Sequence, residues 1–323
     1  MKQFLTGKLR DLHPVVRDIL HLGLYQLYLM DKIPESAAVN ESVVLAKKYC
    51  RGNRNAPGLV NAVLRNAQRN MQNRKEPATL AERYSHPQVL LDLLAQSIGK
   101  ERLEPMLQAN NAAAPTVIQV NTLRTTTDAL LRQLQEEGIQ AQPHAWLADC
   151  LILSSTGNLE ESDSFQKGLF YVQDAAAKLS VLCAQLPKQD DLQVLDCCAA
   201  PGGKSFAAAI ATDGKAQLYS CDIHPHKTVL IQNGAARLGI EKVQVFCHDA
   251  MQDKPEWHNK MDAVIADVPC SGYGIIRKKP DIRYKDPASM AQLPRLQEQI
   301  LHQQAKYVKP GGVLLYSTCT LLK

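Results

Sequence analysis

The stretch Val194-Leu-Asp-Cys-Cys-Ala-Ala-Pro-Gly-Gly-Lys204 decides the fold of the carboxyl-terminal half of this chain. Its first part is an apolar strand, and its second part is a Gly-rich turn from which a helix is expected to start at Lys204. Glycines let backbone N–H groups approach a ligand closely, and a helix N-terminus favours negative charge. The turn is not a phosphate-binding loop, because Cys198 stands where that motif requires Gly, and it does not match G-x-G-x-x-G. It therefore predicts a nucleotide-like ligand other than a dinucleotide.

Strands and helices alternate around this stretch from about residue 171. Apolar strands are expected at Gln193–Cys197, Gln217–Asp222, Lys242–Cys247, Asp262–Asp267 and Gly312–Ser317. The intervening helices are expected at Lys204–Ala211, Thr228–Leu238 and Pro287–Val308. This alternation predicts an α/β, Rossmann-like, doubly wound parallel sheet. Ligands of such sheets bind beyond the carboxyl ends of the strands, and the candidate catalytic and cofactor-binding residues all lie there.

Two acidic residues follow successive strands. Asp222 ends the second strand, 18 residues beyond Lys204, where a carboxylate can accept both hydroxyls of a ribose. Asp249 follows the third strand, where it could receive an adenine amino group. Either residue alone could equally be a helix cap. Together they favour a cofactor that contains adenosine, and S-adenosylmethionine fits better than ATP because the turn offers little to hold a triphosphate.

Two cysteines follow the last two strands of the predicted sheet. Cys270 closes Asp267-Val-Pro-Cys270 after the fourth strand, and Cys319 closes Ser317-Thr-Cys319 after the fifth. Many amino methyltransferases carry an aromatic residue where this chain has Cys270, so the thiol indicates chemistry on carbon. In the expected strand order these two strands are neighbours, about 4.8 Å apart. The two thiols are therefore expected to face one pocket.

A pair of thiols suits C5 of a pyrimidine, which is a poor nucleophile by itself. A thiolate that adds at C6 makes C5 of cytosine nucleophilic; after methyl transfer a base removes the C5 proton and the thiol leaves. A free thiol has a pKa of about 8.5, so a cation such as Lys204 would help to form the thiolate. Asp267 could hold the N3 or N4 edge of the base. This chemistry alone does not show which of Cys270 and Cys319 is the nucleophile.

Basic residues indicate a polyanionic partner. The stretch Arg277-Lys278-Lys279 with Arg283 and Lys285 could bind the phosphates that flank a base turned out of its stack, or it could be a solvated loop. Residues 1–75 carry a net charge of +8, whereas the remainder carries −3. The basic segment favours a nucleic acid partner, with a solvated helical surface as the alternative.

The chain divides into three expected domains, at 1–74, 75–167 and 168–323. Helical spacing dominates residues 12–72, and a polar linker is expected at 73–77. A helical stretch at about 79–110 precedes a small α+β module, whose strand, helix and strand are expected at Thr116–Val120, Thr127–Glu137 and Cys150–Leu153.

Composition narrows the class of protein. The chain has 45% apolar residues, enough for several cores, and lacks a run of about 18 apolar residues or an apolar signal segment at its start. Its nine cysteines include no C-x-x-C pair, so no metal site is expected and free thiols are favoured over disulfides. We therefore expect a cytoplasmic protein without a membrane span. The sequence does not show the oligomeric state, and a monomer is the default expectation.

These motifs together resemble the RNA cytosine-C5 methyltransferases, and specifically the Sun/RsmB type that methylates small-subunit ribosomal RNA. The resemblance extends to Gly168–Asp174, to Ile33–Glu41 and to Gly58–Arg65. It implies an all-α NusB-like amino-terminal domain that binds RNA, a small RRM-like α+β module and a class I methyltransferase domain that binds S-adenosylmethionine. It also implies that Cys319 is the nucleophile and that Cys270 assists product release. The cofactor residues that it implies are Cys198, Ala199, Ala200, Pro201, Gly202, Gly203, Lys204, Asp222, Asp249 and Asp267.

The chain departs from that family pattern at both ends. Family members have further helices before the equivalent of Leu12, and they continue well beyond the four residues that follow Cys319 here, so a truncated form is expected. Thr320 follows Cys319 at a position where the family more commonly has Ser.

The expected function is methylation of a cytosine of 16S ribosomal RNA. An alternative is an RNA-binding or antitermination-type module with an inactive methyltransferase domain; a small-molecule or protein methyltransferase would leave the basic segment and paired cysteines unexplained. The sequence does not identify the cytosine or show whether the RNA is free or in an assembling subunit.

Overall fold

The computed structural model describes the whole chain except residues 6, 74–75, 155–156 and 323. It forms two compact units, Met1–Arg83 and Tyr84–Lys323, and each is described by itself. The three domain boundaries expected from the sequence stay predictions. Part of the linker expected at 73–77 lies outside the described residues.

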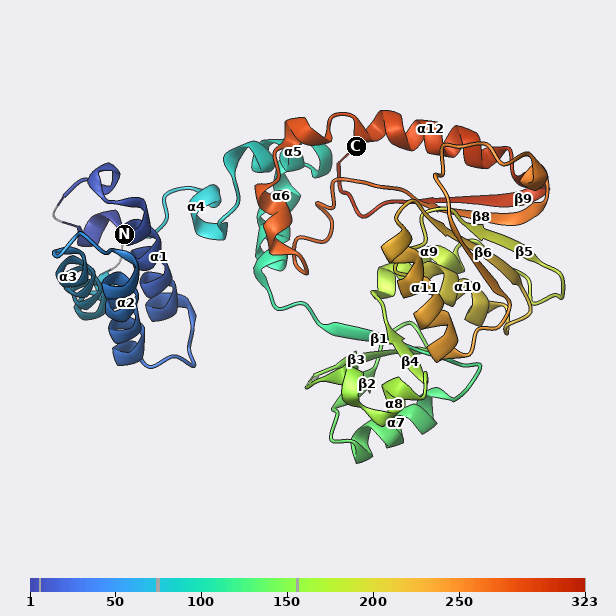
Figure 1. Ribbon diagram of the computed structural model, residues 1–323, viewed down its shortest axis with the longest axis horizontal. Helices are drawn as coiled ribbons and strands as arrows, with labels where there is room; N and C mark the ends of the chain where they lie inside the picture. The colour runs from blue at the N-terminus through green and yellow to red at the C-terminus, as the bar shows by residue number, and fades with distance from the viewer. Residues whose placement is uncertain (6, 74–75, 155–156, 323) are drawn as a thin grey trace. The chain divides into compact units, whose positions relative to one another are not determined.

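The first unit is built on three helices, as the apolar spacing of residues 12–72 predicts. They are α1 (Pro14–Leu29), α2 (Glu35–Tyr49) and α3 (Ala56–Arg69), drawn in blue in Figure 1. Pro14 and Pro57 each lie in a first helical turn, where a missing N–H costs nothing. A Cβ on Gly23 would come 2.6 Å from Leu64 Cδ1, so glycine allows α1 to approach α3 closely.

The helical stretch expected at about 79–110 is divided into three helices. They are α4 (Leu80–Tyr84), α5 (Gln88–Ile98) and α6 (Lys100–Asn111). Pro87 precedes α5 because its ring excludes a preceding helical turn, and Gly99, with φ of +89°, separates α5 from α6. These two residues account for the interruptions.

An antiparallel sheet and two helices follow α6 and confirm the expected α+β module. The strand order is β2 (Ala141–Pro143), β3 (Cys150–Leu153), β1 (Thr116–Val120) and β4 (Phe170–Val172). Its helices are α7 (Thr127–Glu136) and α8 (Asp163–Gln166). Ile118, Leu134 and Phe170 are fully buried in the core between sheet and helices. Thr126 starts α7 by accepting a hydrogen bond from the Ala129 N–H at 3.3 Å.

The last part of the chain contains the predicted parallel sheet. Its order is β7 (Val243–Cys247), β6 (Gln217–Asp222), β5 (Gln193–Asp196), β8 (Met261–Asp267) and β9 (Val308–Ser317), and each neighbouring pair is parallel. Its helices are α9 (Ala175–Leu182), α10 (Gly203–Ala211), α11 (Pro225–Leu238) and α12 (Leu293–Ala305). The helix expected from Pro287 begins only at Leu293, after a short 3-10 turn, because Pro294 suits the first turn of a helix but not its interior.

Both faces of this sheet are covered, which explains why its strands are almost continuously apolar. Val194 and Ile265 belong to the core shared with α10 and α11, whereas Leu195 and Val264 belong to the core shared with α12. Figure 1 shows α12 running beside β8 and β9. The layers bring the carboxyl ends of β5, β8 and β9 to one edge. Among the described helices, none has the length and apolar character needed to cross a bilayer.

Candidate active site

The Gly-rich turn joins β5 to α10 in a conformation that requires glycine. Gly202 has φ of +113°, and its N–H donates to the Ala199 carbonyl at 2.7 Å. A Cβ on Gly203 would lie 2.8 Å from Gln173 Nε2, so the close approach of this segment also depends on glycine. Among the described residues, no side chain caps the start of α10. The turn therefore presents backbone N–H groups at a helix N-terminus, an arrangement that binds polar or anionic ligand groups.

A cavity of about 180 Å³ lies against this turn. Val172, Gln173 and Ala177 line one part of it. The predicted residues on its wall are Cys198, Ala199, Ala200, Pro201, Gly203, Lys204 and Asp267. The structure thus brings most of the expected cofactor residues together. Gly202 shapes the turn itself.

Asp222 and Asp249 lie at the ends of neighbouring strands, outside the lining of that cavity. Asp222 is 8% exposed, and its Oδ1 accepts a hydrogen bond from the His224 N–H at 3.0 Å. The Oδ1 atom of Asp249 accepts one from the Met251 N–H at 2.9 Å. Both carboxylates thus stabilise turns, as the capping alternative predicts, and their roles toward a cofactor stay predictions.

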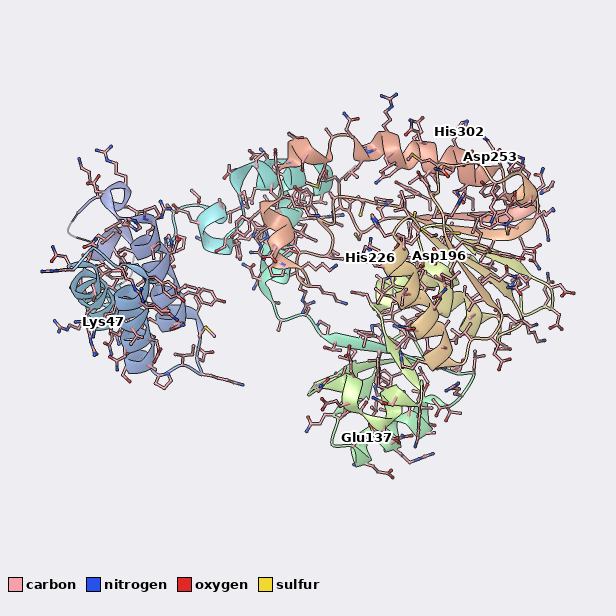
Figure 2. The ribbon with its side chains drawn as sticks, viewed as in Figure 1. Lys47, Glu137, Asp196, His226, Asp253 and His302 are labelled. Atoms are coloured by element: carbon pink, nitrogen blue, oxygen red, sulfur yellow. The ribbon has the colours of Figure 1, made fainter. Side chains whose placement is uncertain are left out.

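Asp196 is a site residue that the sequence reasoning missed. It ends β5 on the cavity wall beside α10, and its side chain is labelled in Figure 2. Ser205 Oγ donates to Asp196 Oδ2 at 2.8 Å, and Ser220 Oγ donates to Ser205 at the same distance. Within the described part of the chain, Oδ1 has no hydrogen-bond partner although it is buried. The sequence does carry a signal for this residue, because Asp196 places a carboxyl at the end of the apolar run Val194–Leu195.

Burial raises the pKa of Asp196 to about 7, although the hydrogen bond from Ser205 opposes the shift. The nearby charge of Asp267 raises this pKa further, whereas Lys204 lowers it. A buried carboxylate oxygen without a partner favours a cationic ligand group. The ammonium of S-adenosylmethionine is such a group, so the cavity fits this cofactor.

Lys204 and Asp267 form an ion pair between α10 and β8. Lys204 Nζ lies 2.6 Å from Asp267 Oδ2, and Ser317 Oγ donates to Asp267 Oδ1 at 2.7 Å. Both carboxylate oxygens are therefore held by chain groups. The expected role of Lys204 as the cation that favours the thiolate stays a prediction: its ammonium is engaged by Asp267, and the leading causes of the lowered Cys270 pKa are hydrogen bonds from Cys319 and Gly272.

The two expected cysteines face each other at the ends of β8 and β9. Their Sγ atoms are 2.9 Å apart, and the Cys319 N–H donates to Cys270 Sγ at 3.2 Å. Asp267 and Ser317 pair across the two strands, so the cysteines lie three and two residues beyond one rung of the sheet. The prediction that both loops reach one place is confirmed.

The pKa values of the two thiols are shifted in opposite directions. The hydrogen bond from Cys319 lowers the pKa of Cys270 to about 6, and the N–H groups of Gly272 and Cys319 lower it further, against opposing effects of burial and of Asp267. The same interaction raises the pKa of the Cys319 thiol, because a second negative charge beside Cys270 is unfavourable. The directions of the two pKa shifts therefore favour Cys270 as the thiolate and Cys319 as the thiol.

A second cavity, of about 470 Å³, opens beside the cysteines. Ser271, Thr318 and Thr320, which flank the two cysteines in the chain, line it together with Tyr273 and Tyr316. The hydroxyls of Ser271 and Thr320 are 2.6 Å apart and join the two loops. This cavity has room for a nucleobase and offers hydroxyl groups to its edges.

The basic stretch after Cys270 is only partly available to a nucleic acid. Arg277, Lys278 and Lys279 are exposed, although Arg277 Nη2 donates to the Ala113 carbonyl at 2.6 Å and Lys278 pairs with Asp174 at 2.6 Å. These bonds lie at the surface, where water and phosphates can replace them.

Burial speaks against the predicted contact between Arg283 and RNA phosphates. Arg283 is 7% exposed, and its Nη1 donates to the Ser85 carbonyl at 3.2 Å and to Asn111 Oδ1 at 3.0 Å. Its guanidinium thus holds the segment after Cys270 against the chain around α5 and α6. This basic residue can be buried because the Tyr84 and Ser85 carbonyls and Asn111 Oδ1 accept hydrogen bonds from its guanidinium.

Comparisons with known proteins match three consecutive parts of the chain. Residues 1–69 match the NusB family, residues 86–160 match the ferredoxin-like domain of RsmF/B-like methyltransferases, and residues 183–323 match 16S rRNA methyltransferase RsmB/F. A solved methyltransferase homologue from Pyrococcus horikoshii is 25% identical, with a TM-score of 0.64 over 76% of this chain and 78% of that one.

Curated relatives match nearly the whole chain. A probable ribosomal RNA small subunit methyltransferase B of Bacillus subtilis is 36% identical over 99% of this chain and 72% of its own length. The ribosomal RNA small subunit methyltransferase B of Vibrio cholerae is 37% identical over 99% of this chain and 73% of its own length. The NusB-like helices, the ferredoxin-like module and the parallel-sheet domain follow one another along this chain. The chain belongs to the ribosomal RNA small subunit methyltransferase B family.

Proposed function

We propose that this chain transfers a methyl group from S-adenosylmethionine to C5 of a cytosine in 16S ribosomal RNA through a covalent bond between cysteine and C6. The observation that carries the proposal is the pair of thiols 2.9 Å apart at the end of the sheet that holds the cofactor cavity. The lowered pKa of Cys270 supports it. The proposed substrate, small-subunit ribosomal RNA, comes from the names of the chain's relatives.

The cofactor would be held by the Gly-rich turn and by Asp196. Asp196 would pair with its ammonium, and Asp222 and Asp249 would bind its ribose and adenine. When bound, it supplies an electrophilic methyl group. The chain's own task is to place that group beside the cytosine and to make C5 nucleophilic.

Cys319 is assigned as the nucleophile and Cys270 as the proton acceptor. Cys319 attacks C6 while its proton passes to the Cys270 thiolate across the 2.9 Å contact. Cys270 then loses this proton to solvent, which its pKa of about 6 favours at neutral pH. As a thiolate it accepts the C5 proton after methylation, and Cys319 leaves as the C6–S bond breaks. The reverse assignment, in which the Cys270 thiolate attacks directly, predicts a different pattern of trapped adducts.

Asp267 would hold the polar edge of the cytosine. Its carboxylate already accepts hydrogen bonds from Lys204 and Ser317 and lies 3 residues before Cys270. Negative charge that develops on the ring as the thiol adds would be stabilised by the Lys204 ammonium. Electrostatic stabilisation of this kind acts without reorganisation, because the ion pair is formed in advance.

The exposed Arg277, Lys278 and Lys279 would bind RNA phosphates near the flipped base. The basic first unit would add RNA affinity, in keeping with its match to the NusB family. We expect the protein to act as a monomer in the cytoplasm, where its RNA substrate is made.

Mass spectrometry of modified nucleosides tests the proposal. The protein is incubated with unmodified 16S ribosomal RNA and S-adenosylmethionine that carries a deuterated methyl group. Labelled 5-methylcytidine at one position supports the proposal. RNA binding without labelled 5-methylcytidine contradicts it and favours the alternative of an RNA-binding module with an inactive methyltransferase domain.

A further inference from the structure

The facing thiols of Cys270 and Cys319 have a chemical capability that methyl transfer does not use. Both are free thiols, and their sulfur atoms are 2.9 Å apart. A disulfide has a sulfur–sulfur distance of about 2.05 Å, so an approach of about 0.9 Å would allow the bond to form. The two sulfurs are thus poised for oxidation as well as for catalysis.

The backbone holds the two loops together on both sides of the cysteines. Before them, the Val268 N–H donates to the Ser317 carbonyl at 3.2 Å. After them, the Gly274 N–H donates to the Cys319 carbonyl at 2.8 Å. Since the separation of the loops is maintained by these bonds, side-chain rotation with little backbone movement would complete the approach.

Access and ionisation distinguish this pair from the other neighbouring cysteines. Cys319 is exposed and Cys270 is partly exposed, so a small oxidant can reach them. Cys197 and Cys198, which are adjacent in the chain, have sulfurs 3.9 Å apart, and Cys197 is buried with its pKa raised. Thiolates react with peroxides, whereas thiols do not.

We propose that Cys270 and Cys319 form a reversible disulfide when the protein meets a peroxide such as hydrogen peroxide, and that this bond switches methyl transfer off. The switch rests on the proposed function, because it requires that these two thiols be the catalytic pair. Formation of the bond itself does not depend on that function.

Oxidation proceeds in two balanced steps. The Cys270 thiolate attacks one oxygen of hydrogen peroxide; a sulfur–oxygen bond forms, the oxygen–oxygen bond breaks, and the hydroxide that leaves takes a proton from solvent. Sulfur is oxidised by two electrons and peroxide is reduced. The Cys319 thiol then attacks the sulfenic sulfur, so that a sulfur–sulfur bond forms, the sulfur–oxygen bond breaks, and the thiol proton leaves with the hydroxide as water.

The disulfide would block catalysis without closing the cofactor cavity. It consumes both the nucleophile and the proton acceptor. Neither sulfur lines the cavity at the Gly-rich turn, whose wall is formed by residues such as Asp196 and Lys204. Binding of S-adenosylmethionine is therefore expected to survive oxidation, whereas methyl transfer is not.

The test treats the full chain with a small excess of hydrogen peroxide at pH 7 and then blocks remaining thiols with iodoacetamide. Peptide mapping without reductant locates linked cysteines, and methyl transfer and cofactor binding are measured on the same samples. Cys183→Ser is the matched control, since Cys183 is exposed and lies outside the site. Cys270→Ser and Cys319→Ser each remove one partner.

A peptide that joins Cys270 to Cys319, formed equally in Cys183→Ser and lost with dithiothreitol, is the expected result. Methyl transfer falls at least tenfold and recovers on reduction, while the cofactor affinity changes less than twofold. Separate alkylation of Cys270 and Cys319 in an active, peroxide-treated enzyme overturns the switch and leaves the proposed function intact. A complete disulfide with unchanged methyl transfer overturns the switch together with the proposed function.

Discussion

Lys204 Nζ lies 2.6 Å from Asp267 Oδ2, and this contact joins the first turn of α10 to the end of β8. One end of the ion pair therefore belongs to the Gly-rich turn and the other to the segment that carries Cys270. Both residues line the cofactor cavity. The pair is the physical link between the place where the cofactor is expected and the place where the base is expected.

Asp267→Asn should lower kcat by about 10²- to 10⁴-fold while the Kd for S-adenosylmethionine changes little. The amide keeps the shape of the side chain but loses the charge that pairs with Lys204 and orients the base. Methyl transfer under saturating RNA and cofactor, with calorimetry for binding, separates the two quantities. A loss that is confined to cofactor binding would contradict the role given to Asp267. Asp262→Asn is a matched control at the other end of β8, where the carboxylate pairs with Lys309.

Asp196→Asn should stabilise the cofactor-free protein at alkaline pH. The folded protein keeps the Asp196 proton up to about pH 7, whereas an ordinary Asp releases it near 3.8. Folding thus takes up a proton between these values, so the contribution of Asp196 to the free energy of unfolding falls as pH rises from 4 to 7. An amide does not ionise and escapes this loss.

Thermal unfolding at pH 5 and pH 8 checks this expectation. The Tm of Asp196→Asn minus that of the parent should be more positive at pH 8, and the variant should bind S-adenosylmethionine at least tenfold more weakly. Equal Tm differences at the two pH values would show that Asp196 does not carry the raised pKa.

Alkylation of Cys270 by iodoacetamide should increase with pH through a midpoint of about 6 and level off by pH 8. The reagent reacts with the thiolate, and hydrogen bonds from Cys319 and from backbone N–H groups stabilise that form. Peptide mapping across pH gives the midpoint, an apparent value for the coupled pair. Cys319→Ser replaces the thiol donor and should move the midpoint upward; an unchanged midpoint would assign the shift to the backbone alone.

Arg283→Met should destabilise the fold by about 1–3 kcal/mol, because the Ser85 carbonyl and Asn111 Oδ1 lose a charged, buried donor. Lys279→Met, four residues earlier and exposed, should change stability by less than about 0.5 kcal/mol and should instead weaken RNA binding. Chemical denaturation and RNA titration over a range of salt concentrations measure both effects. Equal stabilities of the two variants would contradict the burial of Arg283.

The sequence was sufficient for the order of the parallel sheet because the central strands β5 and β8 contain short apolar runs, whereas β9 begins at Val308, before the expected Gly312. Val194–Leu195 and Val264–Ile265 are buried on both faces, and that burial produces an unbroken apolar pattern. The meeting of Cys270 with Cys319 followed from strand order alone, since both residues lie just beyond neighbouring strands.

Other features depend on contacts that no local pattern records. Arg283 was grouped with exposed basic residues because nothing in the sequence shows that Ser85 and Asn111 lie beside it. Asp196 was overlooked because its burial depends on the packing of α10 over β5. The pKa shifts of the cysteines depend first on the hydrogen bond between the two thiols and then on backbone N–H groups, and the geometry of these bonds appears only in the folded chain.

The most direct test of the account is to trap the covalent intermediate. Cys270→Ala and Cys319→Ala variants are incubated with S-adenosylmethionine and 16S ribosomal RNA and separated on denaturing gels. A protein–RNA adduct that survives denaturation in Cys270→Ala and is absent in Cys319→Ala is the predicted result, because Cys319 forms the bond to C6 and Cys270 is needed to release it. The opposite pattern would exchange the two roles. The absence of an adduct in both variants, with RNA binding retained and the parent chain inactive, would contradict the covalent mechanism.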